Sequence, residues 1–426
     1  MKATGLHLCL VGVNHSTTPV DFREKLAISV DQRRDAAISL LDYVPQGVIL
    51  STCNRTEVYA ADTHAHRADQ ASIDFLKARA NTADGELLPH TYRYQDKEAI
   101  RHLFLVASGL NSMIIGEHEI LGQVARALEE VEELGSIELP LRNLFRQAVR
   151  VGRRVRQETD VSKGSLSVSS VAVDLVSGVV GDLAACRILV IGAGDAGRLV
   201  VEAARKRGAS RIAVTNRSQD RAAALAAQLG GKVVPLYNLG EALAESDVVV
   251  SCTGAPHMIL DRRSVEEAMS LRPEQPLVIV DIAVPRDVEP EVSRIDNVFL
   301  YNIDHLNELS GWNRKQRQGE IEKATTIIDA EAEKFARWWQ TLSVRPTISA
   351  LVEKAENIRR AQLDLTFKKI PRLSDEERES LEAMTKAIVT KLLHDPIQHL
   401  KSDSDGRYDC VQLVNELFRL RPEDME

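Results

Sequence analysis

The alternation of apolar and polar residues in the first hundred positions predicts short strands with helices between them. Segments 6–13, 47–50 and 58–61 have the pattern of strands, and segment 29–41 has the period of a helix. A further helix is expected to begin at Ser72. These elements favour a small α/β domain built on an antiparallel or mixed sheet.

Segment 97–156 has helical periodicity almost throughout. Ile100, Leu103 and Phe104 share one face, and His102 lies on the neighbouring face. A single histidine on a helix is more often solvent-exposed or satisfied than catalytic, so the pattern alone assigns His102 no role.

Arginines recur about every four residues near the end of this segment, which places them on one helical face. They are Arg142, Arg146, Arg150 and either Arg153 or Arg154. The chain has a formal net charge of −8, so any RNA contact must come from a local basic cluster. This arginine stripe is a candidate phosphate-binding surface, and the alternative is a solvated or salt-bridged helix face.

The chain changes character after Asp160. Segment 161–170 is small and polar, as expected of a hinge, and segment 187–191 is a nearly all-apolar strand. A glycine-rich turn, a helix and a second strand at 211–215 follow. The turn consists of Gly192, Ala193, Gly194, Asp195, Ala196 and Gly197. Strand, turn and helix N-terminus together predict the pyrophosphate cradle of a Rossmann-type dinucleotide-binding domain.

Two more apolar strands, within 247–254 and 277–285, complete a doubly wound pattern. Both end in small residues near the expected crevice. Cys252 is interpreted as one of these small lining residues.

The end of the second strand of this domain indicates which nicotinamide cofactor is bound. NAD-specific enzymes of this fold carry an Asp or Glu about 20 residues past the glycine turn. This chain has Asn216, Arg217 and Ser218 there, and Asp220 is expected to start the next helix. Arginine and hydroxyl groups can bind a 2′-phosphate, so the sequence predicts NADPH. The alternative is that Arg217 only caps the sheet edge.

The last third is predicted to be helical. A first helix of about 30 residues is expected to end at Pro346, and a second follows over 348–358. A capping box at 374–377 opens a third helix, and 411–418 forms a fourth. The apolar stripe of the first helix can pack within the chain or against a partner. Its positions are Ile321, Ala324, Ile328, Phe335, Trp338 and Leu342.

Length and composition set the general class of protein. A chain of 426 residues with 44% apolar residues predicts two to four globular domains. No apolar run approaches the roughly 18 residues of a membrane span, and no secretory leader is visible, so we expect a cytoplasmic protein without a membrane partner. The five cysteines form no Cys-x-x-Cys pair, which argues against disulfides and against a metal site.

Cys53 is the candidate nucleophile because it comes directly after a predicted strand. Thr52 and Asn54 flank it, and Arg55 lies two residues further on. These groups can favour the thiolate and hold an anionic substrate. The alternative is a buried structural cysteine.

Several segments resemble, in order, the landmarks of the glutamyl-tRNA reductase family, the enzymes that start tetrapyrrole synthesis from glutamate. They are 12–15 (Gly-Val-Asn-His), 51–57 (Ser-Thr-Cys-Asn-Arg-Thr-Glu), 106–112 (Val-Ala-Ser-Gly-Leu-Asn-Ser), 116–123 (Gly-Glu-His-Glu-Ile-Leu-Gly-Gln), the glycine turn and 392–396 (Leu-Leu-His-Asp-Pro). The blocks around Cys53 and at 116–123 are far more specific than any glycine motif.

The resemblance implies a multidomain α/β fold. Residues 1–158 would form an α/β catalytic domain that recognises glutamyl-tRNA, and residues 159–308 a Rossmann NADPH-binding domain. Residues 309–426 would form a spinal helix and an all-helical dimerisation domain. The chain would then act as a homodimer.

The resemblance also implies a reaction. Cys53 would attack the glutamyl ester of glutamyl-tRNA(Glu), and NADPH would reduce the resulting thioester to glutamate-1-semialdehyde, the first step of the route to 5-aminolevulinate and haem. His102 would be a proton donor or orienting group. The product could pass to a glutamate-1-semialdehyde aminomutase. The implied substrate-binding residues are Thr52, Asn54, Arg55, Ser112, Glu117, His118, Glu119 and Gln123.

The chain departs from the family pattern at three positions. The family commonly has Asp at position 111 and Pro-Gln at 118–119, whereas this chain has Asn111, His118 and Glu119. Two other functions stay open: an NADP-dependent reductase of a small free metabolite, similar to shikimate dehydrogenase, and a non-catalytic tRNA-binding or scaffolding protein.

Overall fold

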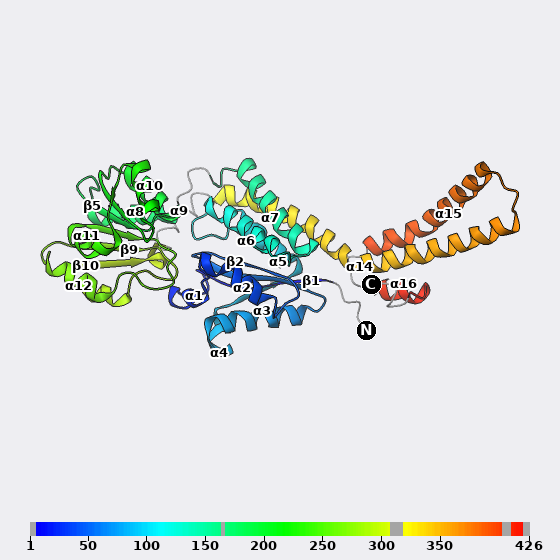
Figure 1. The fold of residues 1–426 in the computed structure, drawn as a ribbon, viewed down its shortest axis with the longest axis horizontal. Coiled ribbons are helices and arrows are strands. Elements are labelled where there is room, and N and C mark those ends of the chain that lie inside the picture. Colours follow the sequence, from blue (N-terminus) through cyan, green and yellow to red (C-terminus); the bar gives the residue numbers. More distant parts are fainter. Residues whose placement is uncertain (1–5, 163–166, 307–317, 403–409, 421–426) are drawn as a thin grey trace. The chain divides into compact units, whose positions relative to one another are not determined.

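The computed structural model describes residues 6–162, 167–306, 318–402 and 410–420 (Figure 1). The chain forms two compact units. The larger comprises Leu8–Ala61 and His66–Ala332, and the smaller comprises Met1–His7, Asp62–Ala65 and Glu333–Glu426. The centre of the predicted hinge and the predicted boundary at 308/309 lie outside the described residues.

The N-terminal part of the larger unit is built on a sheet of four strands in the order β2-β3-β1-β4. These are β1 (His7–Asn14), β2 (Gly47–Ser51), β3 (Arg55–Asp62) and β4 (Tyr92–Gln95). Strands β2 and β3 pair antiparallel, as do β1 and β4. Every residue of β3 is buried, so its polar side chains must find partners inside the protein.

Helices cover this sheet. Figure 1 shows α5, α6 and α7 packed together on one side of the sheet and α3 on the other. The helices are α1 (Val20–Leu26), α2 (Arg33–Leu40), α3 (Ala65–Ala80), α4 (Asp84–Leu87), α5 (Asp96–Ala107), α6 (Glu119–Glu133) and α7 (Leu139–Glu158), with single 3₁₀ turns at Val30–Gln32 and Leu88–His90.

The prediction of a nearly continuous helical segment over 97–156 was wrong in two places. Residues 134–138 separate α6 from α7, and an irregular loop over 108–118 separates α5 from α6. Gly109 and Gly116 of the second loop have φ angles of +76° and +79°. Such left-handed backbone suits glycine and cannot continue a helix. In α7, a Cβ at Gly152 would lie 2.6 Å from the carbonyl oxygen of Ala107, so α7 crosses the end of α5 at close range.

The second part of the larger unit is a six-stranded sheet in the order β10-β9-β8-β5-β6-β7, with all pairs parallel. The strands are β5 (Arg187–Ile191), β6 (Arg211–Thr215), β7 (Lys232–Val233), β8 (Val248–Ser251), β9 (Leu277–Asp281) and β10 (Val298–Asn302). The helices are α8 (Val168–Val180), α9 (Asp195–Lys206), α10 (Gln219–Leu229), α11 (Leu239–Glu245) and α12 (Arg262–Ser270), with 3₁₀ turns at Leu236–Asn238 and Pro290–Arg294.

The order of these strands confirms the predicted doubly wound fold. The chain runs from β5 outward to β7 and then returns to the other side of β5 with β8. The crevice at the carboxyl ends of β5 and β8 is therefore a topological switch point, which is where such sheets bind nucleotides.

The C-terminal helices are α14 (Gln318–Lys369), α15 (Asp375–Ser402) and α16 (Cys410–Leu417). The prediction that Pro346 ends the first helix was wrong, because Pro346 lies inside α14. Proline removes one N–H donor, but its φ angle is compatible with a helix. Ala350 and Leu351 just beyond it are buried with Leu393, so packing offsets the lost hydrogen bond.

The predicted capping box is confirmed. The backbone N–H of Glu377 donates to Ser374 Oγ at 3.2 Å, and the backbone N–H of Ser374 donates to Glu377 Oε2 at 2.8 Å. Among the described residues, no helix has both the length and the apolar character needed to cross a membrane.

Candidate functional site

Cys53 lies in the tight turn between β2 and β3, and hydrogen bonds fix that turn from several sides. The backbone N–H of Thr52 donates to the Arg55 carbonyl at 2.8 Å, and that of Asn54 donates to Thr52 Oγ1 at 3.1 Å. Arg23 Nη1 donates to the Cys53 carbonyl at 2.8 Å. The backbone that carries the thiol is therefore held in place.

A pocket of about 320 Å³ joins this turn to the glycine-rich loop within the larger unit. Its lining includes, from the N-terminal part, the predicted residues Thr52, Cys53, Asn54, Glu117, Glu119 and Gln123. From the second part it includes Gly194, Asp195, Ala196, Thr253, Gly254, Ala283 and Val284, and Cys252 is also there, as interpreted from the sequence. A thiol and a nucleotide-binding loop thus share one cavity.

Other predicted site residues lie outside this pocket. Ser112 is buried in the loop before α6, and His118 is the N-cap residue of α6. His118 lines a neighbouring cavity of about 310 Å³ together with Ser167, Lys206 and Arg207. Their substrate-binding roles stay predictions.

Arg55 and His102 belong to a buried network around Glu57. Arg55 Nη1 donates to Glu57 Oε1 at 2.7 Å, and His102 Nε2 lies 2.8 Å from the same oxygen. Tyr59 Oη donates to Glu57 Oε2 at 2.7 Å, and Tyr92 Oη donates to Oε1. Burial alone would raise the pKa of Glu57, but Arg55 and His102 hold it well below its usual range.

The guanidinium of Arg55 has a second partner, Asn111, in addition to Glu57. Its Nη1 and Nη2 each lie 3.1 Å from Asn111 Oδ1, and Nη2 also donates to the Asn111 carbonyl. Only 2% of Arg55 is exposed. The substrate contact expected of Arg55 therefore stays a prediction, and in this structure its guanidinium joins β3 to the 108–118 loop.

The expectation that residues flanking Cys53 favour its thiolate was wrong for this state of the pocket. Burial, together with the nearby Glu117 and Glu119, raises the pKa of the Cys53 thiol to about 12. Arg23, and not the neighbouring Arg55, is the cation that lowers this pKa. The thiol is therefore held mainly protonated at neutral pH.

The glycine turn has the shape of a phosphate cradle. A Cβ at Gly197 would lie 2.1 Å from the Gly192 carbonyl oxygen, and Gly192 has a φ of +119°. Gly194 faces open space and precedes α9 without a side-chain cap, so the helix N-terminus is free to donate backbone N–H groups. The residues present therefore fit a dinucleotide.

The residues expected to read the 2′-phosphate follow β6. Asn216 Nδ2 donates to the Ser218 carbonyl at 3.2 Å, and Ser218 Oγ caps α10 by accepting from the Arg221 N–H at 3.4 Å. Arg217 is exposed. Asp220 lies in the first turn of α10, as predicted.

The arginine stripe is partly neutralised. Glu132 lies 2.8 Å from Arg146 and 3.3 Å from Arg142, and Arg154 pairs with Glu158 and Glu331. Within the described part of the chain, no ion pair engages the exposed Arg150 and Arg153.

Sequence reasoning missed several residues near the pocket. Arg126 lines it one helical turn after Gln123 on α6, a spacing that could have indicated it. Local sequence pattern could not indicate three further residues, because their partners are distant in sequence. They are Arg23, Arg286 and Asp304.

Fold and site together define a multidomain oxidoreductase whose nicotinamide nucleotide-binding domain shares a pocket with a cysteine. Family models for the "Glutamyl-tRNAGlu reductase, N-terminal domain" and the "Glutamyl-tRNAGlu reductase, dimerisation domain" match residues 11–159 and 323–420. A "Shikimate / quinate 5-dehydrogenase" model matches residues 174–309.

Full-length relatives agree. The chain is 41% identical to glutamyl-tRNA reductase of Carboxydothermus hydrogenoformans, over 98% of this chain and 94% of that protein. It is 40% identical to glutamyl-tRNA reductase of Syntrophobacter fumaroxidans, over 98% of this chain and 92% of that protein. It is 32% identical to the solved glutamyl-tRNA reductase of Methanopyrus kandleri, with a TM-score of 0.52, over 97% of this chain and 99% of that protein. The chain belongs to the glutamyl-tRNA reductase family, and the likeness to shikimate dehydrogenase is confined to the middle domain.

The pKa of Glu117 predicts how replacing this residue changes protein stability at different pH values. Burial raises it to about 7, above the value of about 4.3 in an unfolded chain. As pH rises from about 4.5 to 7, the unfolded state ionises first, so this residue makes the native state progressively less stable. Glu117→Gln should therefore gain stability over the native chain, from little near pH 4.5 to roughly 3 kcal/mol at pH 8. Denaturant unfolding at both pH values measures this, and an equal difference at both would contradict it.

Proposed function

We propose that this chain carries out its family's reaction, the NADPH-dependent reduction of glutamyl-tRNA(Glu) to glutamate-1-semialdehyde, the first step of tetrapyrrole synthesis by this route. The observation that carries the proposal is the pocket shared by Cys53 and the nucleotide-binding loop. A nucleophile and a hydride donor must both reach one carbonyl carbon, and a pocket lined by both a thiol and the nucleotide-binding loop supports this.

The proposed first step is acyl transfer. Cys53 Sγ attacks the glutamyl carbonyl, the C–O bond to the tRNA ribose breaks, and the thiol proton leaves while the tRNA hydroxyl gains one. The ester is already activated, so no nucleoside triphosphate is needed. The product is a thioester between the glutamyl group and Cys53.

The proposed second step is reduction of that thioester. NADPH, when bound, supplies the hydride for the acyl carbon. The C–S bond then breaks, Cys53 regains a proton, and the free aldehyde leaves. Sulfur donates less electron density to a carbonyl than oxygen does, so the thioester accepts hydride more readily than the ester.

Pocket residues have proposed roles around the acyl group. Asn54 Oδ1 is buried and has no hydrogen-bond partner among the described residues, so it can accept from the ammonium group of the glutamyl moiety. Glu117, with a pKa of about 7 raised by burial, can hold or release a proton near neutral pH. His102 contacts Glu57 and does not line the pocket, which supports the orienting role rather than direct proton donation.

Cys53→Ser should abolish both the trapped acyl-enzyme and aldehyde formation, because a serine hydroxyl is a far weaker nucleophile at neutral pH. NADPH affinity should stay unchanged. The measurement follows radiolabelled glutamyl transfer to protein and NADPH oxidation with glutamyl-tRNA as substrate. Cys186→Ser is the matched control, since Cys186 is a buried cysteine that does not line the pocket.

Full turnover by Cys53→Ser would exclude the thioester mechanism. A native chain that binds glutamyl-tRNA but neither deacylates it nor oxidises NADPH would instead indicate the non-catalytic tRNA-binding alternative.

We propose that Arg150 and Arg153 on α7 contact tRNA phosphates. They are the members of the arginine stripe that keep an unneutralised charge among the described residues. Each phosphate contact releases condensed counterions, so its loss lowers the salt dependence of binding.

Arg150→Glu with Arg153→Glu should weaken tRNA binding and reduce the slope of log affinity against log salt by roughly two. NADPH affinity should not change. Arg263→Glu, an equivalent change at an exposed arginine of α12, is the control. If the salt slope stays unaltered, these arginines do not contact tRNA phosphates and are ordinary solvated groups.

We propose NADPH rather than NADH as the cofactor. Arg217 is exposed beside Asn216 and Ser218 at the end of β6, and these residues carry no carboxylate that would repel a 2′-phosphate. A guanidinium can bind such a phosphate through two parallel hydrogen bonds.

Arg217→Ala should lower kcat/KM with NADPH by about tenfold or more while leaving kcat/KM with NADH nearly unchanged, because only the former cofactor has the phosphate. Steady-state kinetics with each cofactor measure the ratio. Arg221→Ala, in the first turn of α10, is the control. A native preference for NADH, or an undiminished preference for NADPH in the variant, would show that this loop does not read the phosphate.

We propose that the chain is a homodimer through its C-terminal helices. Large apolar side chains are exposed along α14 and α15, and a single chain leaves them uncovered. They are Ile358, Leu365, Met384, Ile388 and Leu392.

The proposed division into catalytic, NADPH-binding and dimerisation domains at 158/159 and 308/309 is supported by the ranges of the three family models. The cytoplasmic location and the transfer of product to an aminomutase stay predictions.

A further inference from the structure

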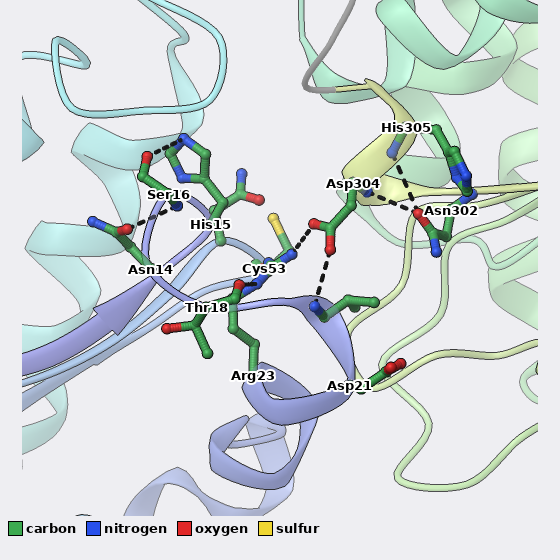
Figure 2. A network of polar contacts seen from close by, with 12 residues as sticks. Asn14, His15, Ser16, Thr18, Asp21, Arg23, Cys53, Asn302, Asp304 and His305 are labelled. Atoms are coloured by element: carbon green, nitrogen blue, oxygen red, sulfur yellow. Dashed lines mark hydrogen bonds and ion pairs between the residues drawn. The ribbon is translucent and has the colours of Figure 1, made fainter. Parts of the chain in front are cut away.

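Helix α1 of the N-terminal part makes ion pairs with residues of the nucleotide-binding part. Asp304 accepts from the backbone N–H of Val20 at 2.9 Å through Oδ2, and its Oδ1 accepts from Arg23 Nη2. Figure 2 shows Asp304 between Arg23 and the start of α1, with Cys53 beside Arg23. One carboxylate therefore bonds both the helix and its buried arginine.

Arg23 connects this contact to the nucleophile. Its guanidinium also donates to the carbonyl oxygens of Thr18, at 3.0 Å, and Cys53, at 2.8 Å. The side chain is 2% exposed, so its donors depend on protein acceptors rather than water. Asp304 thus acts on the backbone of Cys53 through a single buried group.

A second set of contacts forms on the same helix. Arg286 Nη2 and Nε donate to Glu24 at 2.7 and 3.0 Å, and Arg286 Nη1 lies 2.7 Å from Asp21. The neighbouring Asp287 accepts from the N–H and Oγ1 of Thr253, a residue of the pocket, at 2.8 and 2.6 Å. The segment that carries Arg286 and Asp287 therefore contacts α1 and also holds Thr253 on the nucleotide side of the pocket.

Apolar packing joins the two parts at the same place. Val20, Met113 and Ile114 are buried in one cluster with Ile303 and Leu306, which flank Asp304. The charged contacts consequently sit at the edge of a desolvated surface, where such pairs determine register and orientation more than affinity.

We propose that the Asp304–Arg23 and Arg286–Glu24 pairs are docking contacts that place the nucleotide-binding part over Cys53 for the reduction step, with Asp304 and Arg286 as positioning residues. Neither residue touches the reacting atoms. The inference rests on the proposed thioester mechanism and assigns these contacts to its second step alone. Acyl transfer needs only residues of the N-terminal part, whereas hydride delivery needs both parts in register.

The test separates the two steps. Acyl-enzyme formation is measured with radiolabelled glutamyl-tRNA in the absence of NADPH, and reduction is measured as single-turnover NADPH oxidation after the acyl-enzyme has formed. Asp304→Asn and Arg286→Glu should each slow reduction by about tenfold or more, because each removes one partner of a docked charge pair, while acyl-enzyme formation stays within about threefold of the native rate. NADPH affinity should stay unchanged.

Two further variants complete the design. Asp174→Asn removes a carboxylate paired with Arg207 at 2.6 Å, away from α1, and should alter neither step. Glu24→Arg should slow reduction, and Glu24→Arg combined with Arg286→Glu should restore part of it, because the pair is rebuilt with reversed charges although Asp21 then faces a carboxylate. This exchange tests the proposal even if Asp304→Asn fails to fold.

Equal losses in both steps, or a double exchange that recovers nothing, would overturn the docking role and leave these residues structural. Native reduction rates in all the docking variants would overturn it as well. Failure of the proposed function is distinguishable, because the native chain would then form no acyl-enzyme at all.

Discussion

The N-terminal part of the larger unit depends on the contacts of one buried carboxylate, that of Glu57. This carboxylate bonds Arg55 on its own strand, Tyr92 on β4 and His102 on α5, so one charge ties two strands and a helix together. Removing one partner of a buried ion pair costs about 3–5 kcal/mol, a large share of the stability of a domain. Because Cys53 precedes Arg55 by two residues, this network also fixes the backbone beside Cys53.

The docking contacts differ from that network in their exposure. Asp304 is 35% and Glu24 19% exposed at the side chain, whereas Glu57 is fully buried. Water competes for these carboxylates, although the arginines that they pair with are largely buried, so lost hydration offsets part of each attraction. Contacts of this kind can set the orientation of the nucleotide-binding part without preventing its release, which suits an enzyme that must admit a tRNA and discharge an aldehyde.

Local pattern predicted the strands, the glycine cradle and Cys53, because period, turn residues and motif are properties of neighbouring positions. It could not predict that Arg55 would be engaged by Glu57 and Asn111, since that depends on the 108–118 loop folding back on β3. The Arg23–Asp304 contact joins residues 281 positions apart and has no local signal. Pro346 was misjudged for a similar reason: a proline penalty is local, but the packing that offsets it comes from α15.

Arg23 links the nucleotide-binding part to Cys53. Burial and two carboxylates raise the pKa of the thiol, and Arg23 lowers it. The same guanidinium donates to the Cys53 carbonyl oxygen and to Asp304. Because Arg23 is buried, these protein acceptors rather than water fix its position. The cation that favours the Cys53 thiolate is therefore held in place by a residue of the nucleotide-binding part.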